Sequence, residues 1–192
     1  MIRRPGDLIL RCQSQAGQQR REETHENADQ NANRFDFRHH HSSGDGERPA
    51  TAAGAADYPY GPPIGLEAAK KVMAAAEADA IKNNWGMAIA ILDSTGHMVM
   101  LHKLDNTQYG SLMAAEDKAL SAINYRRPSK VFEDLVAQGG IGLRSLALRG
   151  ASPLEGGIPI NVDGKIVGAI GVSGGTSVQD GQVAKAGADV AK

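Results

Sequence analysis

The stretch "EGGIPINVDGKIVGAIGVSGG", residues 155–175, decides how the fold is read, because it holds seven glycines in twenty-one residues. Two runs rich in β-branched residues, "GIPINV" and "KIVGAIGVSG", flank Asp163 and Gly164. An Asp-Gly pair between such runs is the strongest short hairpin signal, because both turn residues need positive φ. The stretch therefore predicts an antiparallel β-hairpin.

The glycines also invite two enzymatic interpretations, and neither fits. A dinucleotide fingerprint places its glycines in a turn between a parallel strand and a helix, whereas Gly168 and Gly171 lie inside the second predicted strand. "GVSGG" matches the G-x-S-x-G pattern of a hydrolase around Ser173, but that chemistry needs a later histidine and none follows His102. We expect the glycines mainly to let another backbone approach closely.

The end of this stretch leaves two interpretations open. Residues 173–176 open the last predicted helix, and N–H groups at a helix start can hold a carboxylate or another anion. Ser173, Gly174 and Thr176 are therefore candidate ligand-binding residues, while close packing explains the same glycines equally well.

Before this hairpin, the spacing of apolar residues predicts a helix, another β-hairpin and two helices, and after it a final helix. Their order is helix, β-hairpin, helix, helix, β-hairpin, helix, with a loop and one short strand before the second hairpin. Local hairpins in place of long crossovers give an antiparallel α+β fold. The predicted ranges are helices at 66–84, 111–126, 128–138 and 177–192, and strands at 86–93 and 98–105.

The first 57 residues differ from the rest. They contain arginines but no lysine and few apolar residues, so we expect a disordered leader, 1–57, which is possibly a non-native extension, before a domain at 58–192. "ATAAGAADYP" resembles the end of a signal peptide without the apolar region that should precede it, which indicates a cytoplasmic protein.

Composition excludes several classes of function. The net charge is −1, and no basic stripe with interleaved aromatics exists, which argues against nucleic-acid binding. No apolar run reaches membrane-spanning length. Cys12 is the single cysteine, so the domain has no disulfide and no thiol catalysis.

A few polar residues are candidates for binding. Met98, Met100, His102 and Leu104 point one way along a strand, so His102 is either a haem-iron ligand or a hydrogen-bonded histidine on a half-buried strand. The other candidates are charged groups, each of which can equally be a surface charge: Lys103, Asp105, Lys118 and Arg126.

Four blocks together resemble the GlcG/HbpS-like family, which includes the C-terminal domain of PduO-type proteins. They are the stretch quoted first, "DSTGHMVMLHKLDN", "AAEDKALSAINYRRPSKVF" and "QDGQVAKAGAD". The resemblance covers about 64–192. It implies a profilin-like fold, with a five-stranded antiparallel sheet flanked by helices, and it implies homo-oligomers. The family pattern usually has arginine where this chain has Lys103, which weakens carboxylate binding there.

The resemblance also implies a function. Some members bind haem, so we expect an oligomeric small-ligand-binding protein that binds haem or a related tetrapyrrole, with His102 as the proposed ligand. Other members accompany glycolate, diol or aromatic catabolism. The alternative is therefore an enzyme or accessory protein acting on a small organic acid, with one anionic pocket built from Lys103, Asp105, Lys118, Arg126 and residues 173–176.

Overall fold

A computed structural model describes residues 58–191. The predicted leader, 1–57, lies outside the described residues. The elements follow the predicted order, and an additional 3₁₀ helix, η1, stands where a short strand was expected. They are α2 (Leu66–Lys82), β1 (Ala88–Asp93), β2 (Met98–Lys103), α3 (Ser111–Tyr125), α4 (Lys130–Gln138), η1 (Gly140–Ala147), β3 (Gly157–Val162), β4 (Lys165–Ser173), α5 (Ser177–Ala188) and η2 (Asp189–Ala191).

The sheet is antiparallel throughout and has the order β2-β1-β4-β3. It holds four strands within residues 58–191, where the family resemblance implied five. A further segment runs beside β4, where Tyr60 forms an isolated bridge with Ile166 and the backbone N–H of Ile64 donates to Val167, but it forms no named strand. Three prolines surround Tyr60 at positions 59, 62 and 63. Because proline has no N–H to donate, this segment cannot extend into a full strand.

The Asp-Gly turn is confirmed. Asp163 and Gly164 have φ of 50° and 71°, and they join β3 to β4. Both central residues are therefore in the left-handed region that a two-residue hairpin turn requires.

The first hairpin turns at residues 93–97. Thr95 donates to Asp93 Oδ1 from its backbone N and from Oγ1, at 2.8 and 2.6 Å, and the backbone N–H of His97 donates to the same oxygen. Burial raises the pKa of the Asp93 carboxyl. The hydrogen bonds from Thr95 and His97, with the nearby His97 ring, outweigh burial and hold the pKa below its ordinary value.

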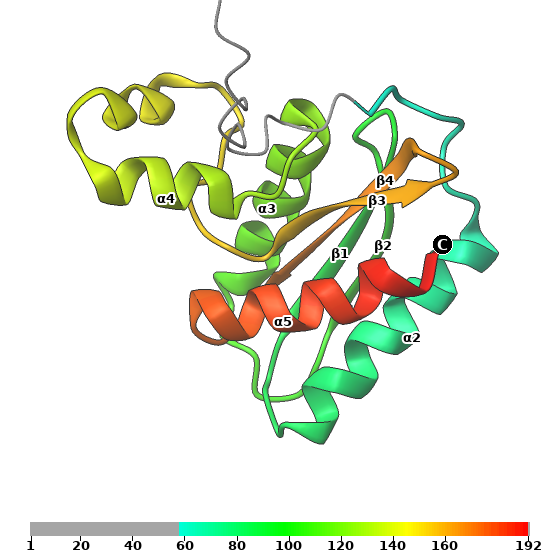
Figure 1. Ribbon diagram of the computed structural model, residues 1–192. Helices are drawn as coiled ribbons and strands as arrows, with labels where there is room; N and C mark the ends of the chain where they lie inside the picture. Colours follow the sequence, from blue (N-terminus) through cyan, green and yellow to red (C-terminus); the bar gives the residue numbers. More distant parts are fainter. Residues whose placement is uncertain (1–57, 192) are drawn as a thin grey trace, which may run out of the picture. The chain divides into compact units, whose positions relative to one another are not determined.

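Helices cover both faces of the sheet (Figure 1). On one face α2 and α5 pack over the larger core, whose members include Val72, Met73, Ile89, Ile170 and Val183. On the other face α3 packs over small residues of β1 and β4. Within residues 58–191 the fold is thus a three-layer α+β arrangement.

The glycines of β3 and β4 set how closely α3 approaches. A Cβ at Gly171 would lie 1.9 Å from the backbone oxygen of Ala115, and one at Gly157 would lie 2.1 Å from that of Lys118. Both distances are far inside van der Waals contact. The expectation that these glycines serve close packing is therefore confirmed for the second hairpin.

The segment after α4 differs from the expected loop with a short strand. Gly139 and Gly140, with φ of 68° and 52°, end α4 and reverse the chain, and the following residues form η1. Its large apolar residues Leu143 and Leu146 are three apart, which matches the period of a 3₁₀ helix and not that of a strand.

Candidate functional site

A cavity of about 480 Å³ lies where the end of α2 meets the end of β2. We call it the α2–β2 groove, and it is lined by Ile81, Asn84, Trp85, Gly86, Leu104, Asp105 and Asn106. Two tight turns form its walls, because Asn84 and Asn106 have φ of 57° and 61°. Ile81 is 66% exposed, so a large apolar side chain stands open beside the groove.

The two walls of the groove touch at Gly86. A Cβ at this position would lie 2.9 Å from the backbone oxygen of Asp105. On its other side, a Cβ at Gly174 would lie 2.3 Å from the backbone oxygen of Gly86. The backbone at each of the sequence candidates Asp105 and Gly174 therefore approaches Gly86 closely. Of these two candidates, only Asp105 lines the groove.

His102 pairs with a carboxylate at the edge of the sheet. Its Nδ1 lies 2.7 Å from Oε1 of Glu77 on α2, and the side chains are 43% and 27% exposed. An ionised carboxylate only accepts hydrogen bonds, so Nδ1 carries the proton. In the neutral ring, Nε2 is then unprotonated and can coordinate a metal. A histidine that ligates a metal commonly donates its other N–H to a carboxylate in this way.

The pair lies next to the groove. Ile81 follows Glu77 by one helical turn, so the two share a face of α2, and Leu104 follows the end of β2. Trp85 and Leu104 both pack against the larger core. Ile81 and Leu104 therefore connect the His102–Glu77 pair to the groove, whose lining combines apolar and polar residues.

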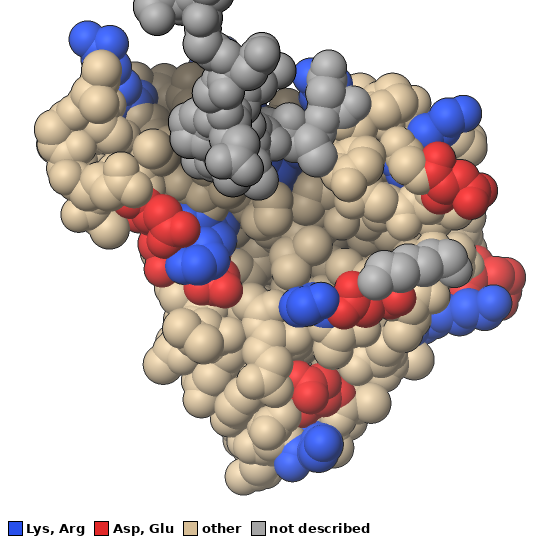
Figure 2. Space-filling model, viewed as in Figure 1, with Lys and Arg blue, Asp and Glu red and all other residues tan. Residues whose placement is uncertain are grey.

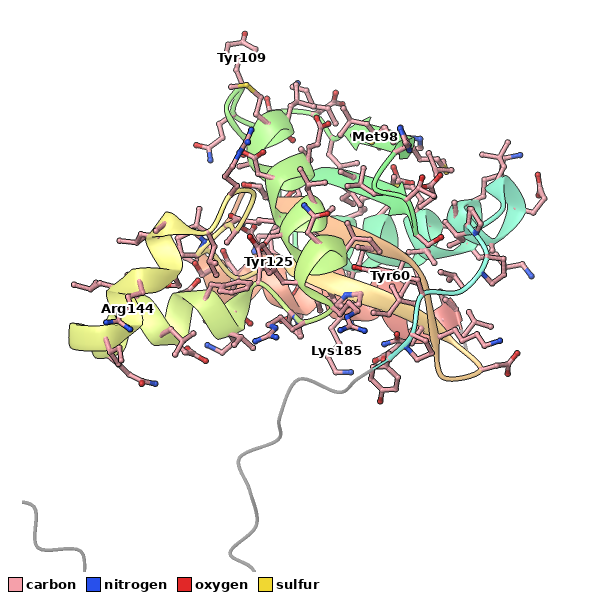
Figure 3. All side chains as sticks on the ribbon, turned by 90° about the horizontal axis from the view of Figure 1, so that it is seen from above. Tyr60, Met98, Tyr109, Tyr125, Arg144 and Lys185 are labelled. Atoms are coloured by element: carbon pink, nitrogen blue, oxygen red, sulfur yellow. The ribbon has the colours of Figure 1, made fainter. Side chains whose placement is uncertain are left out.

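The expected alignment of two methionines with His102 is corrected by a bulge. His102 and Met100 pair with Ile89 and Ile91, which belong to the core beneath α2. The register shifts between Ile91 and Leu92, so Met98 pairs with Leu92 of the cluster beneath α3. A bulge inserts one residue and moves the following side chain to the other face. Met98 is consequently on the opposite side from His102 (Figure 3 labels Met98).

Lys103 also lies on the opposite face. It pairs with Ala88, which packs with Ala115 of α3, and its side chain is exposed. Asp105 follows the end of β2 and lines the groove. The expectation that these two residues share a face is therefore not met, because the strand ends between them.

Lys118 is buried in an ion pair. Its Nζ lies 2.6 Å from Oδ2 of Asp180 on α5 and donates to the backbone oxygen of Val172 at 3.0 Å. The two side chains are only 3% and 4% exposed. Oδ1 of Asp180 accepts from the backbone N–H of Gly175. The position joins α3, β4 and α5, and a ligand does not reach it without displacing Asp180.

The start of α5 binds its own side chains. Thr176 and Gln179 form a capping box, in which each side chain bonds the other residue's backbone N–H. Ser173 is buried within β4. Several N–H groups that an anion would use are thus already satisfied, so the structure favours the packing interpretation for residues 173–176.

Arg126 lies at the far end of α3. It is the C-cap, with φ of 52°, and its guanidinium lies 5.9 Å from the centre of the Tyr60 ring. Eight residues of helix separate it from Lys118, or about 12 Å. Lys103, Lys118 and Arg126 therefore do not converge on one anionic pocket within the described residues.

Sequence reasoning missed Glu77. It occupies an alanine-rich face of α2, where helical spacing marks neighbours only within the helix. Its contact with His102 spans 25 residues and depends on how α2 packs against β2. The available signal in the sequence was Glu77, one helical turn before Ile81, and this signal is weak on its own.

The family follows from a comparison of sequences. A sequence profile described as "Haem degrading protein HbpS-like" matches residues 64–189, which span the fold from α2 to the end of α5. The chain belongs to the HbpS-like family. The resemblance found in the four sequence blocks is confirmed.

Individual relatives agree with this assignment. Protein GlcG of Escherichia coli K12 is 40% identical over 110 residues, which cover 57% of this chain and 81% of GlcG. A crystal structure of HbpS is 30% identical with a TM-score of 0.62, and the match covers 72% of this chain and 97% of HbpS. A PduOC:heme complex matches with a TM-score of 0.60 over 68% of this chain and 95% of that one. At 23% identity the complex supports the fold alone.

Residues 58–191 lack two features that would indicate other kinds of site. They contain no helix of the length and apolar character that crossing a bilayer requires. The same residues hold no cluster of three or more histidine, cysteine or carboxylate side chains arranged around a metal ion.

Proposed function

We propose that this HbpS-like chain binds haem or a related tetrapyrrole at the α2–β2 groove, where Nε2 of the neighbouring His102 would hold the iron. The observation that carries the proposal is the 2.7 Å contact between His102 Nδ1 and Glu77 Oε1. The contact orients the ring and places the donor at Nδ1, so that Nε2 of the neutral ring faces away from Glu77 and can bind iron.

The lining of the groove supports the same ligand. Apolar surface is offered to a porphyrin by Ile81, Trp85 and Leu104. The Ile81 side chain is largely exposed, so it is free to contact a ligand. The cavity opens to solvent on the edge of the sheet, which suits a partly exposed haem whose propionates stay in water. The description of the matching family profile, which names haem degradation, lends further support, and the PduOC:heme complex has the same fold.

A second candidate is an enzyme or accessory protein for a small organic acid. The groove carries the carboxylates of Asp105 and, beside it, Glu77, while the cations proposed for such a pocket lie elsewhere. A carboxylate ligand would be repelled there. This alternative remains a prediction, and a thermal-shift screen of carboxylates at millimolar concentration tests it.

The titration of apoprotein with hemin, followed by Soret absorbance, tests the haem proposal. We expect a saturable spectrum distinct from that of free hemin, which the His102→Ala variant loses. His97→Ala is the matched control, because His97 is an exposed histidine on the turn before β2 and should leave the spectrum unchanged. A wild-type spectrum equal to that of free hemin would overturn the proposal. So would full binding by His102→Ala.

We also propose that the chain acts as a homo-oligomer with a small-molecule ligand. The exposed apolar side chains of Ile141 and Leu146 on η1 support the assembly.

A further inference from the structure

The α2–β2 groove is acidic as well as apolar. Of its lining residues, Asp105 is the one with an ionisable side chain, and neither lysine nor arginine is among them. Asn84 and Asn106 contribute neutral amides. Beside the groove, the carboxylate of Glu77 contacts Nδ1 of His102. The formal charges that face a ligand in the groove are therefore negative.

The basic residues nearest in the chain lie outside the groove. Lys82 is in the last turn of α2, where it offsets the partial negative charge at the end of the helix. Lys103 lies on the opposite face of β2 from His102. Where α2 ends (Figure 1), the face shown in Figure 2 carries small separate acidic and basic patches and, among the described residues drawn there, no basic cluster. A ligand carboxylate that enters the groove would thus meet Asp105 with no lining cation to offset the repulsion.

Tetrapyrroles differ in where they carry carboxylates. Haem has propionates on two adjacent pyrrole rings, so the opposite edge of the macrocycle is uncharged. That edge can enter a groove lined by Trp85 and Leu104 while the propionates stay in water. A tetrapyrrole with a carboxylate on every pyrrole ring has no uncharged edge, and whichever edge enters brings a negative charge toward Asp105.

We propose that the groove selects tetrapyrroles that have an edge without carboxylates, and that Asp105 sets this selection by repelling a charged edge. A like charge about 4 Å away lowers affinity roughly fivefold in bulk water, and by more at a protein surface, where the effective dielectric constant is lower. This selection rests on the haem binding proposed above and narrows the class of tetrapyrrole that the groove takes.

Two iron porphyrins differ in the way that the test requires. Iron mesoporphyrin IX and iron coproporphyrin III have the same ring substituents except at two positions, where an ethyl group of the first is a propionate in the second. Each is titrated into the full chain, and quenching of Trp85 fluorescence reports binding, because Trp85 is the single tryptophan and lines the groove. We expect the coproporphyrin to bind at least about tenfold more weakly. Raising the salt concentration should narrow this gap, because salt screens the repulsion.

The Asp105→Asn variant separates the effect of charge from that of ligand size. It keeps the shape of the side chain and removes its charge, so the ratio of the two affinities should fall at least about threefold. Saturable quenching by the mesoporphyrin confirms that this variant is folded. Asp163→Asn is the matched control, because Asp163 is an exposed carboxylate in the turn between β3 and β4 and should leave the ratio unchanged.

The outcomes distinguish this selection from haem binding itself. Equal affinities of the wild type for both porphyrins, tighter binding of the coproporphyrin, or an unchanged ratio in Asp105→Asn would overturn the selection and leave the haem proposal standing. Quenching of Trp85 by neither porphyrin would overturn both.

Discussion

Substitution of Lys118 separates a structural role from a ligand-binding one. Lys118→Met removes the cation of a buried ion pair, and Oδ2 of Asp180 and the Val172 carbonyl lose the hydrogen bonds that Lys118 donates. If the residue bound a ligand at an open site, its loss would change affinity and leave stability nearly intact.

The expected loss follows from the burial of both partners. Breaking a buried ion pair by removing one partner destabilises a fold by about 3–5 kcal/mol, because the remaining charge has no compensation. For a domain of this size that corresponds to a fall in Tm of about 10–20 °C. Adding Asp180→Asn removes the stranded charge and keeps an acceptor for the N–H of Gly175. The double variant should therefore be more stable than Lys118→Met alone.

Urea unfolding followed by circular dichroism measures both effects. Lys185→Met is the control, because Lys185 and Asp189 form an exposed pair at 2.5 Å and such pairs contribute about 0–1 kcal/mol. The reasoning is refuted if Lys118→Met loses less than about 1 kcal/mol. It is equally refuted if adding Asp180→Asn makes the Lys118→Met variant less stable still.

Three further predictions concern packing, pH and the ligand. Gly171→Ala should lose at least about 2 kcal/mol in urea unfolding, because its Cβ would overlap the backbone of Ala115, whereas Gly65→Ala, with nothing within 4 Å, should change little. The pKa of the Asp93 carboxyl in the folded state lies below 3.8. The ionised carboxylate therefore stabilises the fold fully above about pH 4, and this contribution is lost as pH falls through the folded pKa. Asp93→Asn should lose less stability than wild type between pH 6 and pH 3, and a parallel loss would contradict this. Glu77→Gln should raise the Kd for hemin about 10–100-fold without changing the number of sites, and an unchanged Kd would mean that the carboxylate does not orient His102.

The parts of the fold governed by local signals could be predicted from the sequence. The Asp163–Gly164 turn, the apolar period of α2 and the stop at Gly139 each depend on a few consecutive residues. The antiparallel pairing within each hairpin followed from its tight turn, whereas the pairing of β1 with β4 joins the two hairpins and has no local signal.

The remaining features depend on packing between distant segments. The bulge that turns Met98 away from His102 leaves no mark in an alternating strand pattern. Similarly, the sequence indicated a surface charge at Lys118 on α3. The burial of this lysine depends on its ion pair with Asp180, which lies 62 residues later in the sequence. Of the candidate residues, Asp105 lines the α2–β2 groove and His102 on β2 contacts Glu77, whereas Lys118, Arg126, Ser173 and Thr176 do not line the groove. Binding of a ligand by any of them stays a prediction.

Hydrogen–deuterium exchange with and without hemin tests the location of the ligand most directly. If haem binds in the α2–β2 groove through His102, peptides covering residues 77–86 and 100–106 should become protected, while those covering Arg126 and Thr176 should not change. Protection at the start of α5 with none along the groove would contradict the account.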